Sequence, residues 1–412
     1  MTGHTLLERA QRAIAECRRI ATMSEEPGRT TRRFLAPPVR EVHAHLRNRM
    51  ESLGMTVHTD AAGNLRGLWQ PPGARAKRLI LGSHIDTVPN AGAFDGVLGV
   101  ALALEWAQLA QDLKLPLAIE IIAFSEEEGV RFGVPFLGSR AVAGRFDSAL
   151  LTLKDADGIT LEKAIRDFRL DPAQIGDAAL DADVLGFVEM HIEQGPILES
   201  EGLSVAAVTS IVGQSRLTLE FRGHANHSGT TPMHLRRDAL TGAAELITAV
   251  ESAARNTEGL ISTVGKIEVE PNASNVIAGV ARASLDVRHA DDHMRKTAVE
   301  SLLAKAHAIA GKRGLVLQWT QQMDQPAVPM DERLTVYLAD AISASGLPEK
   351  QMNSGAGHDA MVMAACVPSA MLFLRSPGGI SHHPDEMVRE EDVEAALNVG
   401  SKFLQRLAAE VG

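Results

Sequence analysis

Three side chains on one short stretch of the sequence have the types and order needed to bind divalent metal ions. His84 and Asp86 come shortly after the apolar run Leu79–Leu81, and Asp95 follows in the segment Phe94–Gly96. His84 can bind a metal through one ring nitrogen while Asp86 holds the other ring nitrogen. The two oxygens of Asp95 can bridge two metals. The alternative is an ordinary turn after a strand, because Asp next to Gly is common in turns.

Three more segments place potential ligands at the ends of predicted strands. Glu126–Glu128 follow the predicted strand Leu117–Phe124. One of these carboxylates could bind a metal while its neighbour takes a proton from water; a solvated acidic face is the alternative. His191 follows Phe187–Met190 and could instead be structural, and His382–His383 follow a Pro-Gly-Gly loop. Ligands of this kind, without cysteine, suit Zn²⁺, Mn²⁺, Co²⁺ or Ni²⁺.

The elements predicted around these residues form an α/β sheet flanked by helices. The apolar patterns predict helices within about 6–51 and 96–112, and strands at 56–59, 65–69, 79–83 and 117–124. Ligand sites in such sheets lie beyond the carboxyl ends of the strands. The candidate ligands follow the predicted strands, so the elements would bring them to one edge of the sheet.

A second region, 213–327, has the pattern of a separate α+β unit. Its predicted order is strand, helix, strand, strand, helix, strand, the ferredoxin-like split βαβ arrangement, with one of the strands over Ser262–Val269. We therefore expect a discontinuous metal-binding domain, 1–212 and 328–412, with 213–327 inserted into it. His227, in the inserted region, would be too remote to bind the same metals but could reach over a substrate.

Composition excludes several classes of partner. A chain of 412 residues favours two domains. The net charge of -11 and an aromatic content of 4% oppose nucleic-acid binding. Two cysteines far apart in sequence fit a reducing cytoplasm. Met1–Arg9 has no apolar stretch of the signal-peptide type, and the longest apolar runs are too short to span a bilayer, so we expect a cytoplasmic protein without membrane contact.

The motifs together carry a resemblance that extends over nearly the whole chain. The sequence resembles the hydantoinase/carbamoylase family of amidases, within the aminoacylase and carboxypeptidase G superfamily of di-metal hydrolases. The resemblance implies a di-zinc exopeptidase-like catalytic domain and an inserted lid that also makes a homodimer. The motifs that carry it are Gly82–Thr87, Phe94–Gly96, Glu127–Phe132, His191–Gly195, His227–Met233 and Ser354–Asp359.

The resemblance implies a ligand set for two divalent metals. His84 and His191 resemble the terminal ligands of one metal, and Asp95 resembles the bridge. Glu128 resembles a ligand of the other metal. The family pattern Ser-His-x-Pro-x-Glu selects His382 as its last ligand.

Other members of the same motifs resemble catalytic residues. Glu127 resembles the general base, and Asp86 would orient a metal-binding histidine. Glu126 has no role in the resemblance, and His383 falls at a variable position of the family pattern, so we interpret it as an incidental neighbour.

A further set of residues resembles the family's contacts to substrate. A guanidinium such as that of Arg288 can hold a carboxylate through two hydrogen bonds; a surface salt bridge is the alternative. His227 could donate a hydrogen bond to the developing oxyanion, from its own subunit or from a second one. Residues that resemble substrate contacts are Gln194, His227, Asn275, Arg288 and the backbone at Gly355.

The resemblance implies hydrolysis of the carbamoyl C–N bond of a ureido carboxylate, with release of ammonia and carbon dioxide. Allantoate and N-carbamoyl-L-amino acids are the favoured substrates, and β-ureidopropionate is an alternative. Val212–Arg216, Val328–Met330 and Ser354–Ala360 resemble the allantoate branch, whereas Leu374–Ser376 resembles the carbamoyl amino acid branch and contains Arg375, which could alter charge in the pocket. A di-metal aminopeptidase or dipeptidase, and a binding protein on the same scaffold, are the other function classes. A binding protein would have lost a ligand or the base, and none is missing.

Overall fold

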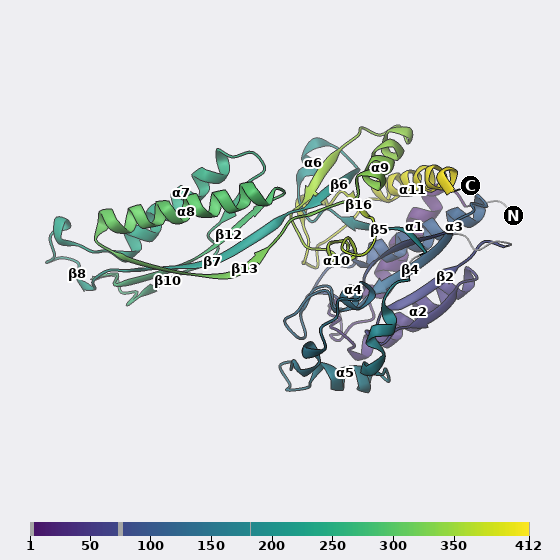
Figure 1. Ribbon diagram of the computed structural model, residues 1–412, viewed down its shortest axis with the longest axis horizontal. Coiled ribbons are helices and arrows are strands. Elements are labelled where there is room, and N and C mark those ends of the chain that lie inside the picture. The colour runs from purple at the N-terminus through teal and green to yellow at the C-terminus, as the bar shows by residue number, and fades with distance from the viewer. Residues whose placement is uncertain (1–3, 73–76, 182, 412) are drawn as a thin grey trace. The chain divides into compact units, whose positions relative to one another are not determined.

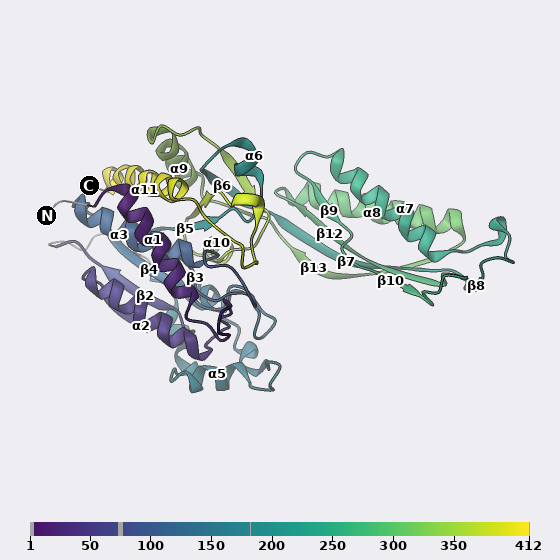
Figure 2. The same cartoon turned by 180° about the vertical axis from the view of Figure 1, so that it is seen from behind.

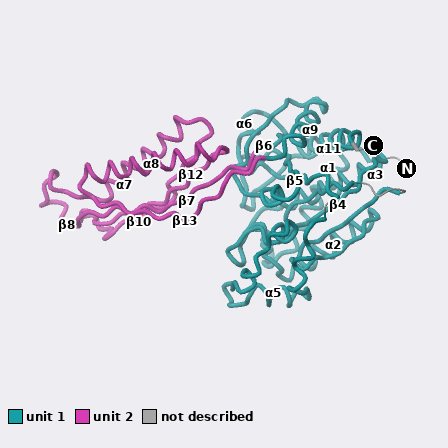
Figure 3. The backbone as a smooth tube through the Cα atoms, viewed as in Figure 1, with its two compact units in different colours: residues 1–209, 330–412 teal, residues 210–329 magenta. Residues whose placement is uncertain are grey.

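The computed structural model describes residues 4–72, 77–181 and 183–411, so that residues 1–3 and 412, at the ends of the expected catalytic domain, lie outside the described residues. The chain divides into two units, one formed by 1–209 with 330–412 and the other by 210–329 (Figure 3). The segment 213–327, predicted as an inserted domain, lies within the second unit.

The first unit is built on a nine-stranded mixed sheet with the order β1-β2-β4-β3-β5-β16-β6-β14, in which β15 pairs with β6 (Figure 1). The four central strands β4, β3, β5 and β16 run parallel to one another. The strands are β1 (Thr56–Thr59), β2 (Leu65–Trp69), β3 (Arg78–His84), β4 (Ala118–Phe124), β5 (Val184–Ile192), β6 (Val205–Ile211), β14 (Val328–Pro329), β15 (Gln351–Ser354) and β16 (Ser369–Leu374).

Helices cover this sheet, because its central strands are apolar without alternation and need cover on both faces. Every residue of β4 and β16 is buried. The helix α3 packs on β3 and β5, and α1 and α11 pack against α3. The helices are α1 (Leu6–Ala21), α2 (Pro37–Ser52), α3 (Val97–Asp112), α4 (Leu137–Val142), α5 (Leu161–Asp167), α6 (Ile197–Glu201), α9 (Glu332–Ala344), α10 (Asp359–Met363) and α11 (Glu390–Val411), with short 3₁₀ turns η1 (Ser148–Thr152), η2 (Pro172–Ala178) and η4 (Pro377–Gly379).

The predicted α/β class is confirmed, and local sequence signals explain several of the boundaries. Pro37 and Pro38 begin α2, where a missing N–H costs no helical hydrogen bond. Thr5 caps α1 by accepting a hydrogen bond from the Glu8 amide, while the Glu8 carboxylate accepts one from the Thr5 amide. The predicted strand 65–69 has the bounds of β2.

The second unit has a five-stranded antiparallel sheet with the order β10-β12-β7-β13, in which β9 pairs with β12. Two long helices lie along one face of the sheet (Figures 1 and 2), and along β7 buried residues alternate with more exposed ones, as a half-covered sheet requires. The elements are β7 (Gly213–Arg222), β8 (Asn226–His227), η3 (Met233–Leu235), α7 (Ala239–Arg255), β9 (Ile261–Thr263), β10 (Ile267–Glu270), β11 (Val276–Ile277), β12 (Val280–His289), α8 (Asp292–Arg313) and β13 (Val316–Gln325).

One strand prediction in this unit is wrong. The segment Ser262–Val269 forms parts of two strands, β9 and β10, rather than one strand. The two pair with different parts of β12, Asp286–Arg288 and Val280–Ala283. Gly265, between them, has no side chain to pack on the pleated surface, so the ladder is interrupted there.

Among the described residues, the structure has no helix of the length and apolar character that crossing a membrane requires.

Candidate metal centre and active site

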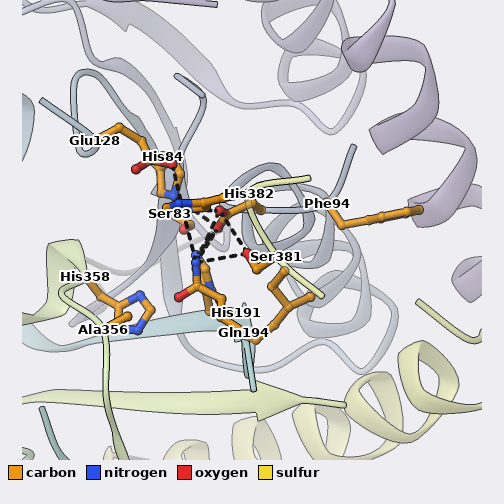
Figure 4. A network of polar contacts seen from close by, with 12 residues as sticks. Ser83, His84, Phe94, Glu128, His191, Gln194, Ala356, His358, Ser381 and His382 are labelled. Atoms are coloured by element: carbon orange, nitrogen blue, oxygen red, sulfur yellow. Dashed lines mark hydrogen bonds and ion pairs between the residues drawn. The ribbon is translucent and has the colours of Figure 1, made fainter. Parts of the chain in front are cut away.

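The four parallel strands of the first unit end at the same edge of the sheet, and the candidate ligands follow those ends. His84 is the last residue of β3, and His191 is the residue before the last in β5. Glu128 follows β4, and His382 lies on the loop after β16. Parallel topology therefore brings together residues that are nearly three hundred positions apart (Figure 4).

Asp95 lies between two pairs of side chains. Its Oδ1 atom lies 3.7 Å from Nε2 of His84 and 3.0 Å from Nε2 of His191. Its Oδ2 atom lies 3.0 Å from Nε2 of His382, and that same nitrogen lies 3.2 Å from Oε1 of Glu128. Each oxygen of the carboxylate thus faces a different pair of potential ligands, as a carboxylate that bridges two ions must.

The histidines are held in the tautomer that metal binding needs. Nδ1 of His84 lies 3.0 Å from the backbone oxygen of Asp86, and Nδ1 of His191 lies 2.9 Å from that of Ile192. A proton on Nδ1 leaves the lone pair of Nε2 pointing inward. Nε2 of His191 is buried and has no hydrogen-bond partner among the described residues. The donor set and this orphaned nitrogen fit a pair of divalent cations.

The electrostatics of the cluster call for positive charge. Burial would raise the pKa of Asp95, but contacts with His191, His382 and His84 hold it well below its usual range. The neighbouring carboxylates of Asp95 and Glu128 raise the pKa of His382 to about 10. Buried carboxylates are stabilised when protons or metal ions supply positive charge beside them.

Asp86 holds the acidic loop rather than an imidazole, which differs from the expectation that its carboxylate orients His84. Its carboxylate oxygen lies 3.7 Å from Nδ1 of His84, beyond hydrogen-bonding distance. Instead, Oδ1 accepts a hydrogen bond from the Glu127 amide at 3.0 Å, and Oδ2 accepts one from the Glu128 amide at 3.1 Å. The backbone oxygen of Asp86, not its side chain, is what orients the His84 ring.

Glu127 combines burial with raised basicity. Burial raises the pKa of its carboxyl well above the usual range, His84 opposes the shift, and the carboxylates of Glu128, Asp359 and Asp86 add to it. Its carboxylate oxygen, one of Glu128 and a nitrogen of His84 lie within 4.8 Å of one another. A carboxylate with a raised pKa beside the ligands is suited to accept and return a proton.

Gln194 and the loop that carries His382 hold the Asp95 carboxylate in place. Nε2 of Gln194 donates to both oxygens of Asp95, at 3.3 and 3.2 Å, and to Oγ of Ser381 at 3.2 Å (Figure 4). Oε1 of Glu386 accepts hydrogen bonds from the amides of Phe94 and Asp95. The role of Glu386 was not predicted, although it is the acidic residue that ends the Ser-His-x-Pro-x-Glu pattern.

A buried polar group behind His191 was also not predicted. The rings of His191 and His358 lie 4.5 Å apart, and Nε2 of His358 lies 2.8 Å from Oγ of Ser354. Glu189 accepts hydrogen bonds from Ser83 Oγ and from a backbone amide of α10. The signal was present in the motif Ser354–Asp359, in which the sequence predicted a role for the backbone at Gly355 alone; Gly355 lies on the loop between β15 and α10.

In the second unit, the structure brings His227 and Asn275 together. The short strands β8 and β11 pair so that His227 lies opposite Val276, and the Ser228 amide donates a hydrogen bond to the backbone oxygen of Asn275 at 3.0 Å. Nδ1 of His227 accepts hydrogen bonds from the amides of Gly229 and Thr230. A nitrogen that accepts carries no proton, so Nε2 of this exposed ring carries it and is a donor.

Arg288 projects from β12 in the same unit and contacts a carboxylate. Its Nε and Nη2 atoms donate to the two oxygens of Asp286, at 2.9 and 3.0 Å. Asp286 also lies 3.0 Å from Nε of Arg216. The guanidinium therefore has the two-pronged geometry that a carboxylate requires.

Arg375 and His383 lie in other contacts. Arg375 is buried and forms ion pairs with Asp392, which is fully buried, and with Glu391, at the start of α11. Arg375 therefore anchors the last helix instead of facing the ligands. His383 is exposed, and its Nδ1 accepts a hydrogen bond from the Asp385 amide.

Comparisons with known proteins give consistent results. The sequence profile of peptidase family M20/M25/M40 matches residues 80–406. Allantoate deiminase of Arabidopsis thaliana is 36% identical over 95% of this chain and 81% of that protein. N-carbamoyl-L-amino acid amidohydrolase of Geobacillus stearothermophilus is 36% identical over 85% of this chain and 86% of that protein. The crystal structure of a hydantoinase/carbamoylase family amidase from Burkholderia multivorans has a TM-score of 0.90 at 31% identity and covers 96% of this chain and 97% of that one.

Proposed function

This chain belongs to peptidase family M20/M25/M40 and, as its motifs predicted, to the hydantoinase/carbamoylase amidases within it, and on that premise we propose that it hydrolyses the carbamoyl C–N bond of a small ureido carboxylate. Allantoate and N-carbamoyl-L-amino acids are the favoured substrates. The observation that carries the proposal is the Asp95 carboxylate between two ligand pairs, with the buried Glu127 beside them.

The metal centre that we propose holds two divalent ions, Zn²⁺ or alternatively Mn²⁺, Co²⁺ or Ni²⁺. His84 and His191 would bind one ion, Glu128 and His382 the other, and Asp95 both. When bound, the ions would polarise the substrate carbonyl and make water more acidic.

Glu127 would carry the proton through the reaction. Its carboxylate takes a proton from the attacking water, whose oxygen forms a bond to the ureido carbon. When the C–N bond breaks, its electron pair stays on nitrogen, which takes the proton from Glu127 and leaves as ammonia. The remaining carbamic acid loses carbon dioxide, and its proton passes to the nitrogen that stays on the product as an amine. The amides that donate to Asp86 fix the backbone of Glu127, so the base stays at one distance from the ligands.

The substrate contacts that we propose are those that the resemblance implies. The Nε2–H of His227 would donate to the oxyanion, and Arg288 would hold the substrate carboxylate in place of Asp286. Gln194, Asn275 and the backbone at Gly355 complete the proposed contacts. His227 would act in its own subunit or across a homodimer formed through the second unit.

Ammonia release from defined substrates tests the proposal. Protein loaded with Zn²⁺ or Mn²⁺ is offered allantoate, N-carbamoyl-L-amino acids, N-carbamoyl-β-alanine and, as a separate class, dipeptides. We expect ammonia from one of the ureido substrates and no cleavage of peptides. Inactivity on all three ureido substrates with metals bound would refute the proposal, and peptide cleavage would favour a peptidase on the same scaffold.

The variant Glu127→Gln separates the base from the ligands. The amide cannot accept the proton, so kcat should fall by roughly 10²- to 10⁴-fold, a typical contribution of general base catalysis. Metal content should match that of the wild-type protein. The matched control is Glu25→Gln, which alters a carboxylate paired with Arg33 away from the ligands. Equal activity of Glu127→Gln and Glu25→Gln would remove the base assignment.

A further inference from the structure

Glu126 is a buried carboxylate next to the candidate base that neither the ligand set nor the proposed mechanism uses. It is fully buried, and its backbone has a φ of 51°. Side chains other than Gly, Asn and Asp seldom adopt this left-handed conformation, so the surroundings must hold it there. Among the described residues, Glu126 belongs to none of the side-chain groups that could bind a metal ion. Its function must therefore differ from that of Glu128.

The Glu126 side chain ties two segments of backbone together. Its Oε2 accepts a hydrogen bond from the Phe34 amide at 3.2 Å, and its Oε1 accepts one from the Arg131 amide at 3.0 Å. Arg131 also contacts Phe34 directly, because its Nη1 donates a hydrogen bond to the backbone oxygen of Phe34 at 2.7 Å. Nε of Arg131 also donates to Asp155 at 3.0 Å. The loop after β4 is thus fastened to the segment that precedes α2.

A second carboxylate, that of Asp86, also holds this loop. Asp86 accepts hydrogen bonds from the amides of Glu127 and Glu128, while Glu126 accepts that of Arg131. Asp86 therefore fixes the peptides of the candidate base and of Glu128, and Glu126 fixes the loop further along at Arg131. An amide cannot replace either carboxylate fully, because its NH₂ group would face a backbone N–H instead of accepting from it.

We propose that Glu126 is a positioning residue, whose carboxylate fixes the loop so that the Glu127 side chain keeps the geometry needed for proton transfer. This inference rests on the function proposed above. Loss of the carboxylate leaves the buried Phe34 amide and the partly buried Arg131 amide without their acceptor. The loop then shifts, and a misplacement of about 1 Å of a catalytic group costs on the order of 100-fold in rate.

Four variants test the proposal. Glu126→Gln keeps the size and removes one acceptor, Glu126→Gly permits the left-handed backbone and removes the whole side chain, and Glu126→Asp keeps the charge in a conformation that Asp tolerates. Glu25→Gln is the control, because it alters a carboxylate that accepts the Arg33 amide on the same N-terminal segment. The readouts are kcat and KM on the ureido substrate that the wild type cleaves, metal content, the thermal midpoint, and backbone hydrogen exchange.

We expect kcat to fall roughly 10- to 100-fold in Glu126→Gln and Glu126→Gly, with KM and metal content unchanged, and part of the loss to be recovered in Glu126→Asp. Exchange at Phe34 and Arg131 should be faster in Glu126→Gln than in Glu25→Gln. A kcat of Glu126→Gln equal to that of the wild type, or wild-type activity of Glu126→Gly, overturns the inference. A loss that only follows metal content or unfolding overturns it too. A wild-type protein inactive on every ureido substrate refutes the proposed function instead.

Discussion

A methyl group added at Gly96 should weaken metal binding at the candidate centre by more than its backbone strain alone can explain. Gly96 follows Asp95, precedes α3 and has a φ of 65°. A Cβ atom at this position would lie 2.5 Å from three atoms of the His84 ring, whereas ordinary contact begins at 3.4 Å. In Gly96→Ala the ring must therefore move by about 0.9 Å, the difference between the two distances.

The His84 ring has little freedom to move. Its Nδ1 is hydrogen-bonded to the backbone oxygen of Asp86 at 3.0 Å, and its plane stacks on that of His191 with ring centroids 5.7 Å apart. Loss of the orientation of a metal-binding histidine weakens metal affinity by about 10- to 100-fold, or about 1.4–2.7 kcal/mol. The left-handed backbone adds about 1–2 kcal/mol of strain for any side chain.

Gly133→Ala is the matched control. Gly133 has a φ of 70°, and a Cβ atom there would have no atom within 4 Å. This variant carries the backbone strain without the contact, so its unfolding free energy should fall by a similar amount while its metal affinity stays that of the wild type.

Competition with a chelator measures the affinity of each variant, and urea unfolding measures its stability. We expect Gly96→Ala to lose metal to the chelator at a concentration about 10- to 100-fold lower than the wild type does. Wild-type affinity in Gly96→Ala, or an equal loss in Gly133→Ala, would refute the reasoning that the methyl group acts through His84.

Three further predictions concern other residues. Burial and two nearby arginines lower the pKa of His43 to about 4, so this histidine is neutral in the folded protein and protonates near pH 6.5 when unfolded; the stabilisation is complete above pH 6.5 and is lost as pH falls toward 4, by up to roughly 3 kcal/mol. Urea unfolding at pH 7.5 and pH 5 should show a smaller fall in unfolding free energy in His43→Leu than in the wild type, and an equal fall in both proteins would contradict this prediction. Arg375→Gln leaves the fully buried Asp392 without its cation and should lower the unfolding free energy by about 3–5 kcal/mol with unchanged metal content; a stable variant, or one that loses metal, contradicts a structural role. Arg288→Lys should raise KM about 10- to 100-fold through loss of a bidentate contact, whereas Arg282→Lys on the same strand should leave initial-rate kinetics unchanged; a similar rise in both variants would show that the strand, not the guanidinium, matters.

Much of the fold could be predicted because its signals are local. Continuous apolar runs predicted the buried central strands, and the helical pattern over 6–51 predicted the region in which α1 and α2 lie. The strand β6 was not predicted, because Val205–Ile211 contains small and polar residues, and its pairing with β16 lies far along the chain. For the same reason a single strand was predicted at Ser262–Val269, where pairing along β12 decides the break.

The candidate site shows the same division. Residue types and the resemblance to the family selected His84, Asp95 and His382 as candidate ligands, and the structure brings these side chains together. The target of the Asp86 carboxylate could not be predicted, because two amides from the loop after β4 reach it only when β3 and β4 pair in parallel.

By itself, the sequence determined which side chains can do the chemistry and which strands they follow, since both depend on residue type and on short-range pattern. Tertiary structure alone decided what each polar group contacts. It left Glu126 to bind two backbone amides instead of a metal, and turned Arg375 toward Asp392. Hydrogen bonds in a buried site depend on distances of a few tenths of an ångström between segments that are remote in sequence, and only the packed fold sets those distances.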